Sequence, residues 1–158
     1  KLPIVAEDLG VIGAEVEELR DAFAFPGMKI LQFAFASDRK NPYLPHNHVK
    51  NSVVYTGTHD NDTTRGWYEK ANKKDKTWVN NYLRTNGKEI WWDFIQTAWA
   101  SVADIAMVPL QDMLGLGSDA RMNTPSTTGM NWKWRFTWEM IPQDAFVRLK
   151  SFTELYGR

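Results

Sequence analysis

The chain of 158 residues has the length of one globular domain, and its 43% hydrophobic content supplies a core, which argues against a disordered protein. Its 19 basic residues balance 19 acidic ones, so no net field attracts nucleic acid or an anionic membrane surface, and neither is expected as a partner. Cysteine is absent, which excludes a disulfide framework, thiolate catalysis and a thiolate zinc site.

The first predicted elements are a strand, a helix and a second strand. The run Ile4–Glu7 is apolar and ends in a carboxylate, as does a buried parallel strand that delivers an acid to a loop. Apolar residues spaced by four, three and four predict a helix over 12–23, which Pro26 and Gly27 end. Residues 29–35 then predict a strand, and the Asn-, Pro- and His-rich residues 41–51 a loop. No initiator methionine or long apolar segment opens the chain, so we interpret it as part of a longer protein.

A third strand and three helices are predicted next. Residues 52–55 are apolar and β-branched, and the strand breaks at the polar run 56–62. Asp62 is a candidate N-cap for a helix over 63–71. Aromatic and aliphatic residues indicate two more helices, around 78–83 and 90–99.

The last predicted elements are a strand over 105–110 and a helix that Pro142 opens, running to residue 152. Strands that alternate with helices predict a parallel sheet with helices outside, and polar residues gather where the strands end. The predicted fold class is therefore α/β, with residues 1–158 forming the C-terminal half of a TIM (β/α)8 barrel of about four parallel strands with outer helices.

Two carboxylates, Glu7 and Asp60, follow predicted strands and would lie at the same mouth of a barrel. A pair of carboxylates there suggests acid/base or glycosidic chemistry. An alternative remains open for each of them, because strand-end acids also cap helices or pair with arginine. Gln32, His59, Gln111 and Asp112 are further polar residues at strand ends.

Other site chemistries have little support in the sequence. The run His59–Asp62 could be interpreted as a metal site, because histidine and carboxylates are ligands, but His46 and His48 lie in a different loop and no third ligand is indicated. The Gly-rich residues 114–117 lack the Lys-Ser/Thr of a phosphate-binding loop, and no serine lies in a nucleophile elbow. We therefore expect neither a metal nor a cofactor.

Several blocks of sequence, in order along nearly the whole chain, resemble the amylomaltase (disproportionating enzyme) type of 4-α-glucanotransferase, glycoside hydrolase family 77 of the α-amylase clan. The blocks are Ala-Glu-Asp-Leu-Gly at 6–10, Pro-Gly-Met-Lys-Ile-Leu-Gln-Phe-Ala-Phe at 26–35, Asn-Pro-Tyr-Leu-Pro-His-Asn at 41–47, Tyr-Thr-Gly-Thr-His-Asp-Asn-Asp-Thr at 55–63, Pro-Leu-Gln-Asp at 109–112 and Arg-Met-Asn at 121–123.

The resemblance implies roles for individual residues. It implies that Glu7 is the general acid/base, that Asp60 stabilises the transition state, and that His59 holds sugar hydroxyls. Asn123 and Phe33 are implied as substrate contacts, and Gln32 is a further candidate for substrate binding. The implied substrate is a malto-oligosaccharide or glucan, and the implied location is the bacterial cytoplasm, or a plastid if the source is a plant or alga.

One departure from the family pattern concerns the nucleophile. The family carries it as an aspartate in an Arg-x-Asp-His block before Ala-Glu-Asp-Leu-Gly, and this sequence contains no such block. The chain alone is therefore expected to be inactive, and half a barrel with open strand edges is expected to self-associate. Two alternatives remain, an α-glucan hydrolase of the same clan and a non-catalytic carbohydrate-binding or assembly module.

Overall fold

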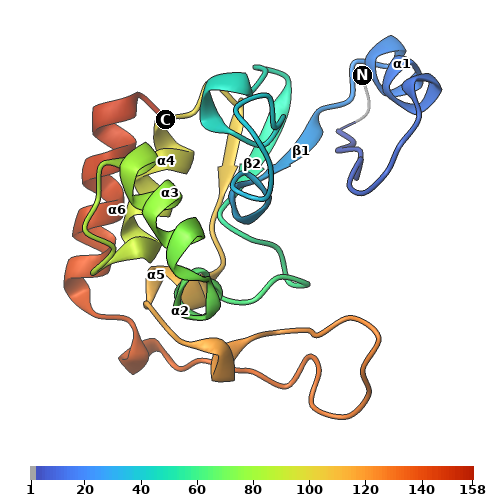
Figure 1. Cartoon of the computed structure of the whole chain (residues 1–158). Helices are drawn as coiled ribbons and strands as arrows, with labels where there is room; N and C mark the ends of the chain where they lie inside the picture. Colours follow the sequence, from blue (N-terminus) through green and yellow to red (C-terminus); the bar gives the residue numbers. More distant parts are fainter. Residues whose placement is uncertain (1–2) are drawn as a thin grey trace.

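A three-stranded parallel sheet lies at the centre of the computed structural model, which describes residues 3–158 (Figure 1). Lys1 and Leu2, the first residues of the predicted 1–158 unit, lie outside the described residues. The strands are β1 (Gly27–Ile30), β2 (Ser52–Tyr55) and β3 (Ile105–Met107), in the order β1-β2-β3. This confirms the α/β class and the parallel sheet.

The sequence of β2 suits its central position. It pairs with β1 from Gly27↔Ser52 to Ile30↔Tyr55, and with β3 from Val53↔Ile105 to Tyr55↔Met107. Val53 and Val54 point to opposite faces and are both buried, as expected for an apolar run in a parallel sheet.

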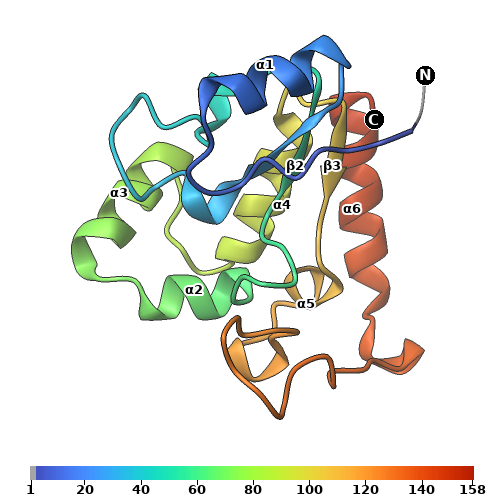
Figure 2. The same ribbon diagram turned by 90° about the vertical axis from the view of Figure 1, so that its right-hand side faces the viewer.

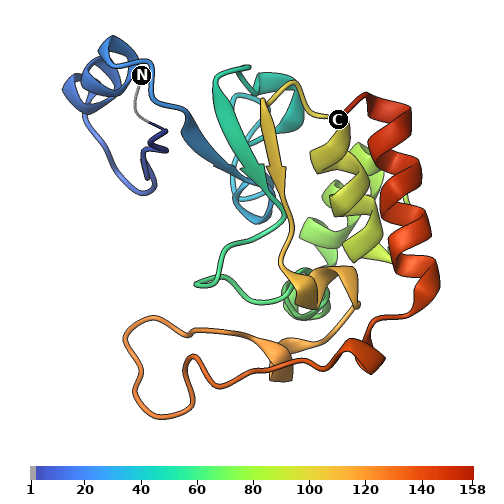
Figure 3. The same ribbon diagram turned by 180° about the vertical axis from the view of Figure 1, so that it is seen from behind.

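Most of the helices lie on one side of this sheet, and the first lies apart from them (Figures 1 and 3). The helices are α1 (Ala14–Ala22), α2 (Thr64–Lys70), α3 (Lys73–Leu83), α4 (Ile90–Ala100), α5 (Leu110–Met113) and α6 (Gln143–Tyr156). Among the residues that the structure describes, no helix is long and apolar enough to cross a bilayer.

The core forms around α4. Six of its side chains are buried, because its sequence is apolar almost all round, and it lies between α6 and the layer of α2 and the sheet. Phe94 contacts Trp67 of α2 and Phe35, with ring centroids 5.3 and 5.9 Å apart. Burial of these aromatic and aliphatic groups is the main contribution to the stability of the fold.

The prediction of about four strands is wrong for the described chain, which has three. The run Ile4–Glu7 is not a strand, although the amide of Ala6 donates a hydrogen bond to the carbonyl oxygen of Pro26 at 2.9 Å. One backbone bond does not make a ladder, and Ile4 and Val5 remain 43% exposed.

Two predicted strands are shorter than expected. After Ile30 the chain turns into a 3₁₀ helix, Leu31–Phe33, because β2 ends opposite it at Tyr55 and offers no further partner. The strand expected over 105–110 ends at Met107, because Pro109 has no amide hydrogen for the ladder and instead precedes α5.

The N-cap of α2 is Thr63 and not Asp62. The hydroxyl of Thr63 accepts a hydrogen bond from the amide of Gly66 at 3.1 Å, whereas Asp62 pairs with Lys70 at 2.6 Å. Asp62 also accepts a bond from the amide of Thr63, one residue on, so its carboxylate lies beside the helix start without capping it.

The predicted apolar face of α1 exists but is exposed. Leu19 and Phe23 are each 60% exposed, and no residue of α1 is buried. Figures 1 and 3 show α1 and the segment before it set apart from the other helices, at the β1 end of the molecule. Amphipathic spacing therefore predicts the helix here but not its burial.

Candidate active site

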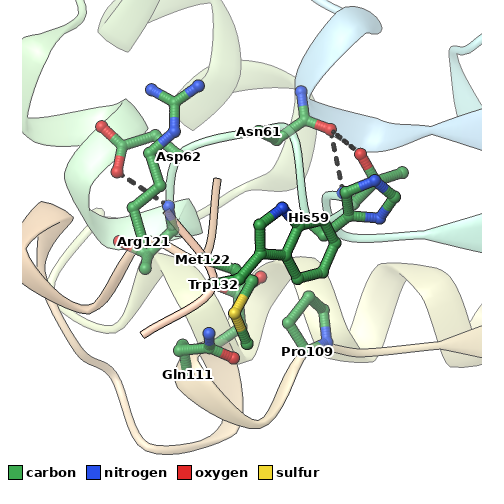
Figure 4. Close-up of a pocket in the computed structure, with 11 residues that line it drawn as sticks. His59, Asn61, Asp62, Pro109, Gln111, Arg121, Met122 and Trp132 are labelled. Atoms are coloured by element: carbon green, nitrogen blue, oxygen red, sulfur yellow. Dashed lines mark hydrogen bonds between the residues drawn. The ribbon is translucent and has the colours of Figure 1, made fainter. Parts of the chain in front are cut away.

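Two neighbouring hollows lie at the carboxyl ends of β2 and β3. The first, which we call the Glu7 pocket, has a volume of about 370 Å³ and is lined by Glu7, Leu9, Met28, Asp60, Met107 and Val108 among others. The second, the Trp132 pocket, has a volume of about 200 Å³ and is lined by Trp132, Asp62, Gln111, Asp112, Arg121 and Met122 among others (Figure 4). Thr58, His59 and Pro109 line both, so the loop after β2 forms their common wall.

Glu7 is positioned through the residues on either side of it. Ala6 is bound to the carbonyl of Pro26, as described above. Asp8 accepts a hydrogen bond from the amide of Met28 at 2.7 Å and forms an ion pair with Arg20 at 2.6 Å. Both anchors tie the chain around Glu7 to the start of β1, and leave the Glu7 carboxyl free to face its pocket.

The structure brings Glu7 and Asp60 into the same pocket, although they are far apart in sequence. Met28, Met107 and Val108 line the same pocket with apolar side chains. Glu7 itself is exposed in the described chain. A mostly apolar hollow with a few convergent polar groups is typical of a small-molecule site.

The loop that carries His59 and Asp60 is held by a short hydrogen-bonded turn. The side-chain oxygen of Asn61 accepts bonds from both the amide and the hydroxyl of Thr58, each at 2.8 Å. The hydroxyl oxygen of Thr58 accepts a further bond from the amide of Asp60 at 3.3 Å. An asparagine that bonds its neighbours in this way favours a turn over a longer strand.

Asp112 forms hydrogen bonds to both ends of this loop, at Thr56 and Thr64. Its carboxylate accepts bonds from the hydroxyl of Thr56 at 2.6 Å and from the amide and hydroxyl of Thr64 at 2.7 and 2.6 Å. Burial raises the pKa of Asp112 above its ordinary value, and these three donors oppose that rise. Asp112, predicted only as a strand-end polar group, is therefore a buried support of the site.

Asp60 is held by two residues of the segment after α5. Asn123 donates its side-chain amide to the Asp60 carboxylate at 2.5 Å, and Arg121 donates to the backbone carbonyl of Asp60 at 2.6 Å. Arg121 also bonds the carbonyl of Asn123 at 2.8 Å, which fixes these two contacts relative to each other. His59 lies alongside, with its Nε2 3.4 Å from the carboxylate.

Trp132 stands against His59 in the same region (Figure 4). Their ring centroids are 4.9 Å apart, and the amide of Trp132 donates to the carbonyl of Met122 at 2.7 Å. The sequence pattern alone indicates no role for Trp132 or Arg121. The Arg-Met-Asn block could have indicated Arg121 as a site residue. The position of Trp132 beside His59 is seen only in the folded loop.

Gln32 and Phe33 lie outside both sets of lining residues. Gln32 is buried and donates its amide to the backbone carbonyl of Asp62 at 2.8 Å, so it supports the site loop. Phe33 is 37% exposed and packs edge-on against Tyr43. Their roles as substrate contacts remain predictions.

No group of three or more His, Cys, Asp or Glu side chains within residues 3–158 is arranged to hold a metal ion. His59 and Asp60 are adjacent, but Asp62 is bound to Lys70 and to the hydroxyl of Ser118 at 2.8 Å. The polar groups of the site therefore bond to each other and to the loops that carry them.

One pocket beside a parallel α/β sheet is lined by His59 and Asp60 from the loop after β2 and by Glu7 from the segment before α1, and this arrangement defines an α/β protein with a site at the strand ends. A profile of the family described as 4-alpha-glucanotransferase matches residues 1–141, and the chain belongs to this family, glycoside hydrolase family 77.

Known relatives carry the same family name. The chain is 57% identical over 159 residues to a 4-alpha-glucanotransferase of Synechocystis, covering 99% of this chain and 32% of that protein. It is 48% identical over 163 residues to the chloroplastic/amyloplastic 4-alpha-glucanotransferase of Arabidopsis thaliana, covering all of this chain and 28% of that protein. The chain thus spans about a third of the length of these relatives.

Two solved structures are similar in fold. An amylomaltase from Streptococcus agalactiae in complex with acarbose matches the whole chain and 32% of its own, with a TM-score of 0.95 and 38% identity. An amylomaltase from Corynebacterium glutamicum matches 96% of this chain and 27% of its own chain, with a TM-score of 0.64. Its identity is 17%, so this match supports the fold alone.

Proposed function

We propose that the intact protein containing these residues is a 4-α-glucanotransferase, which moves α-1,4-glucan segments between malto-oligosaccharides. The observation that carries the proposal is that Glu7 and Asp60 line one pocket in a chain of this family. The acarbose complex of the Streptococcus agalactiae amylomaltase supports a glucan-like ligand.

The proposed reaction is a retaining double displacement. Glu7 donates its proton to the glycosidic oxygen as a nucleophilic carboxylate attacks the anomeric carbon, which releases the leaving chain and forms a glycosyl ester. Glu7, now ionised, accepts a proton from a hydroxyl of the incoming glucan as that oxygen displaces the carboxylate. The nucleophile comes from outside these 158 residues, since the Arg-x-Asp-His block is absent.

The remaining site residues act on the sugar in this proposal. Asp60 binds sugar hydroxyls as the ring flattens, with Asn123 holding its carboxylate in place. His59 binds further hydroxyls, and Gln32 and Phe33 are substrate contacts. The apolar side chains of Met28, Met107 and Val108 in the pocket wall disfavour water as an acceptor.

The architecture of the intact protein follows the same proposal. The three parallel strands form part of the C-terminal half of a (β/α)8 barrel, which the whole-chain match to one third of an amylomaltase supports. Relatives include a chloroplastic/amyloplastic protein, so the cytoplasm of a bacterium or a plastid is the proposed location.

Product analysis tests the proposed activity. The intact protein incubated with maltotriose should give a ladder of longer oligomers together with glucose. An α-glucan hydrolase would only shorten the substrate, and a non-catalytic binding module would leave it unchanged. Either of the last two results would exclude a glucanotransferase.

A second experiment concerns the chain on its own. We expect it to turn over no maltotriose and to bind glucan weakly at most, because it lacks the nucleophile. Transfer that survives purification, and that Asp60→Asn abolishes, would contradict the view that the nucleophile lies elsewhere.

A further inference from the structure

A row of aromatic side chains leads away from the candidate active site. We call Trp132, Trp134, Phe136 and Trp138 the aromatic strip; they occupy every second position of a segment without helix until Trp138 opens a 3₁₀ helix. Trp132 lies in the turn that precedes this segment, with φ 62°. Figures 1 and 2 show this segment passing below the sheet and α5 on its way to α6.

The strip begins inside the site and ends outside it. Trp132 lines the Trp132 pocket, and its ring lies 4.9 Å from that of His59, with the two planes tilted by 39°. Trp134 and Phe136 follow, stacked with centroids 6.2 Å apart and planes at 21°, and Phe136 meets Trp138 edge-on at 5.6 Å. Phe136 therefore contacts the rings on both sides of it, and this row of three begins two residues along the chain from Trp132 in the pocket.

Three of the four residues of the strip are exposed to solvent, and Trp134 is half-buried. Trp132 is 53% exposed, Phe136 41% and Trp138 74%. Large aromatic groups are usually buried, so a contiguous exposed group of them marks an interaction surface.

The backbone of the strip is fixed by its own residues. The Arg135 guanidinium donates to the carbonyls of Trp132 and Trp134 at 2.9 and 2.7 Å. The loop before the strip is closed by Asn131, which accepts a bond from the amide of Thr124 at 2.9 Å and donates to the carbonyl of Thr127 at 3.1 Å. Ordered rings lose less entropy when a ligand covers them.

We propose that the aromatic strip is a binding track for the part of an α-glucan chain that extends beyond the catalytic pocket. Flat apolar rings fit the C–H faces of pyranose units, and the polar edge of tryptophan can bond their hydroxyls. The continuity of the strip with the pocket favours an extended polymer that occupies both. The charged Lys133 and Arg135 interrupt the aromatic residues and disfavour a buried protein interface.

This inference rests on the proposed function, since it concerns the same glucan, and its test has a readout independent of transfer. Trp138→Ala and Phe136→Ala in the intact protein are compared by affinity electrophoresis in amylopectin gels. Phe23→Ala is the control, because Phe23 is also an exposed, stacked aromatic but follows α1, which Figure 1 shows far from the segment that carries the strip. Circular dichroism melting of each variant checks that it folds.

We expect each strip variant to reduce retention by amylopectin by about two- to tenfold, the effect of losing one aromatic contact. Transfer from maltotriose, which is too short to need the strip, should be unchanged, and Phe23→Ala should behave like the parent protein.

Two outcomes would contradict the proposal that the aromatic strip binds glucan. One is normal maltotriose transfer with retention as in Phe23→Ala. The other is a lowered melting temperature in Trp138→Ala with unchanged retention, which would mean that another part of the protein or a second copy covers the rings. If the parent protein shows no transfer but is retained by amylopectin, and Trp138→Ala reduces that retention, the proposed function is wrong and the glucan-binding role of the strip is supported.

Discussion

The side-chain amide of Asn123 donates a hydrogen bond to the carboxylate of Asp60 at 2.5 Å, across a separation of 63 residues in sequence. The backbone amide of Asn123 also bonds the carbonyl of His59 at 3.1 Å. The segment after α5 therefore orients both polar residues that the loop after β2 presents to the site.

The Asn123→Ala variant should lose most of this orientation. We expect transfer by the intact protein to fall roughly tenfold to a hundredfold in kcat/KM, the usual loss when a hydrogen bond to a charged group is removed. Asn51→Ala, at an exposed residue before β2, is the matched control and should remain active. Equal activities of the two variants on maltotriose would show that Asn123 does not position Asp60.

Gly57 should not tolerate even a methyl group. A Cβ at this position would lie 2.6 Å from the side-chain nitrogen of Gln32, which bonds the carbonyl of Asp62. We expect Gly57→Ala to lower the free energy of unfolding by about 1–3 kcal/mol, as overpacking does. Urea denaturation of the intact protein measures this change in the free energy of unfolding.

The double variant Gly57→Ala with Gln32→Ala provides the control for that mechanism. Removing the Gln32 side chain makes room, so Gly57→Ala should cost less in this background than alone. Purely additive effects of the two substitutions would mean that the clash with Gln32 is not the cause.

The buried His48 predicts a pH dependence of stability. Its ring bonds the hydroxyl of Ser101 at 2.7 Å and the carbonyl of Tyr43 at 2.9 Å, and burial lowers its pKa below the ordinary value of 6.5. Below pH 6.5 the unfolded chain then binds more protons than the native state, so acid favours unfolding.

The free energy of unfolding should therefore fall as the pH drops from about 6.5, by no more than about 1.4 kcal/mol per pH unit for this one group. Urea titrations of the parent and of His48→Gln at several pH values measure the difference. The variant should show the shallower dependence over this range, and parallel curves would remove His48 as the cause.

The free edge of β3 predicts association of the chain on its own. Ile105 and Met107 are 44% and 49% exposed, and β3 pairs only with β2 among the described strands. An open apolar edge favours pairing with another chain. Light scattering should show oligomers that grow with concentration, and Ile105→Lys should reduce them. A clean monomer over a wide concentration range would contradict this.

The parts of the fold that the sequence predicts well are those where local pattern and burial agree. The apolar run of β2 and the aromatic-rich α4 lie where expected, because each is buried by neighbours on several sides. The run Ile4–Glu7 has an equally apolar pattern but only one backbone bond to β1. A strand needs a partner ladder, which the pattern of one segment does not contain.

The candidate site divides in the same way. Glu7, His59 and Asp60 could be predicted because they follow apolar runs and match family blocks, and the structure places all three at one pocket. Asp112 as a buried anchor and Trp132 as a neighbour of His59 depend on how distant loops fold back. Spacing along the chain carries no record of such contacts.

The most direct test of the central claim is the behaviour of Glu7→Gln in the intact protein with two donors. With maltotriose, whose leaving oxygen needs a proton, the variant should form no ladder of longer oligomers. With α-maltosyl fluoride, whose leaving group needs none, it should still release fluoride. A ladder from maltotriose at the rate of the parent protein would contradict the claim that Glu7 and Asp60 form the transfer site.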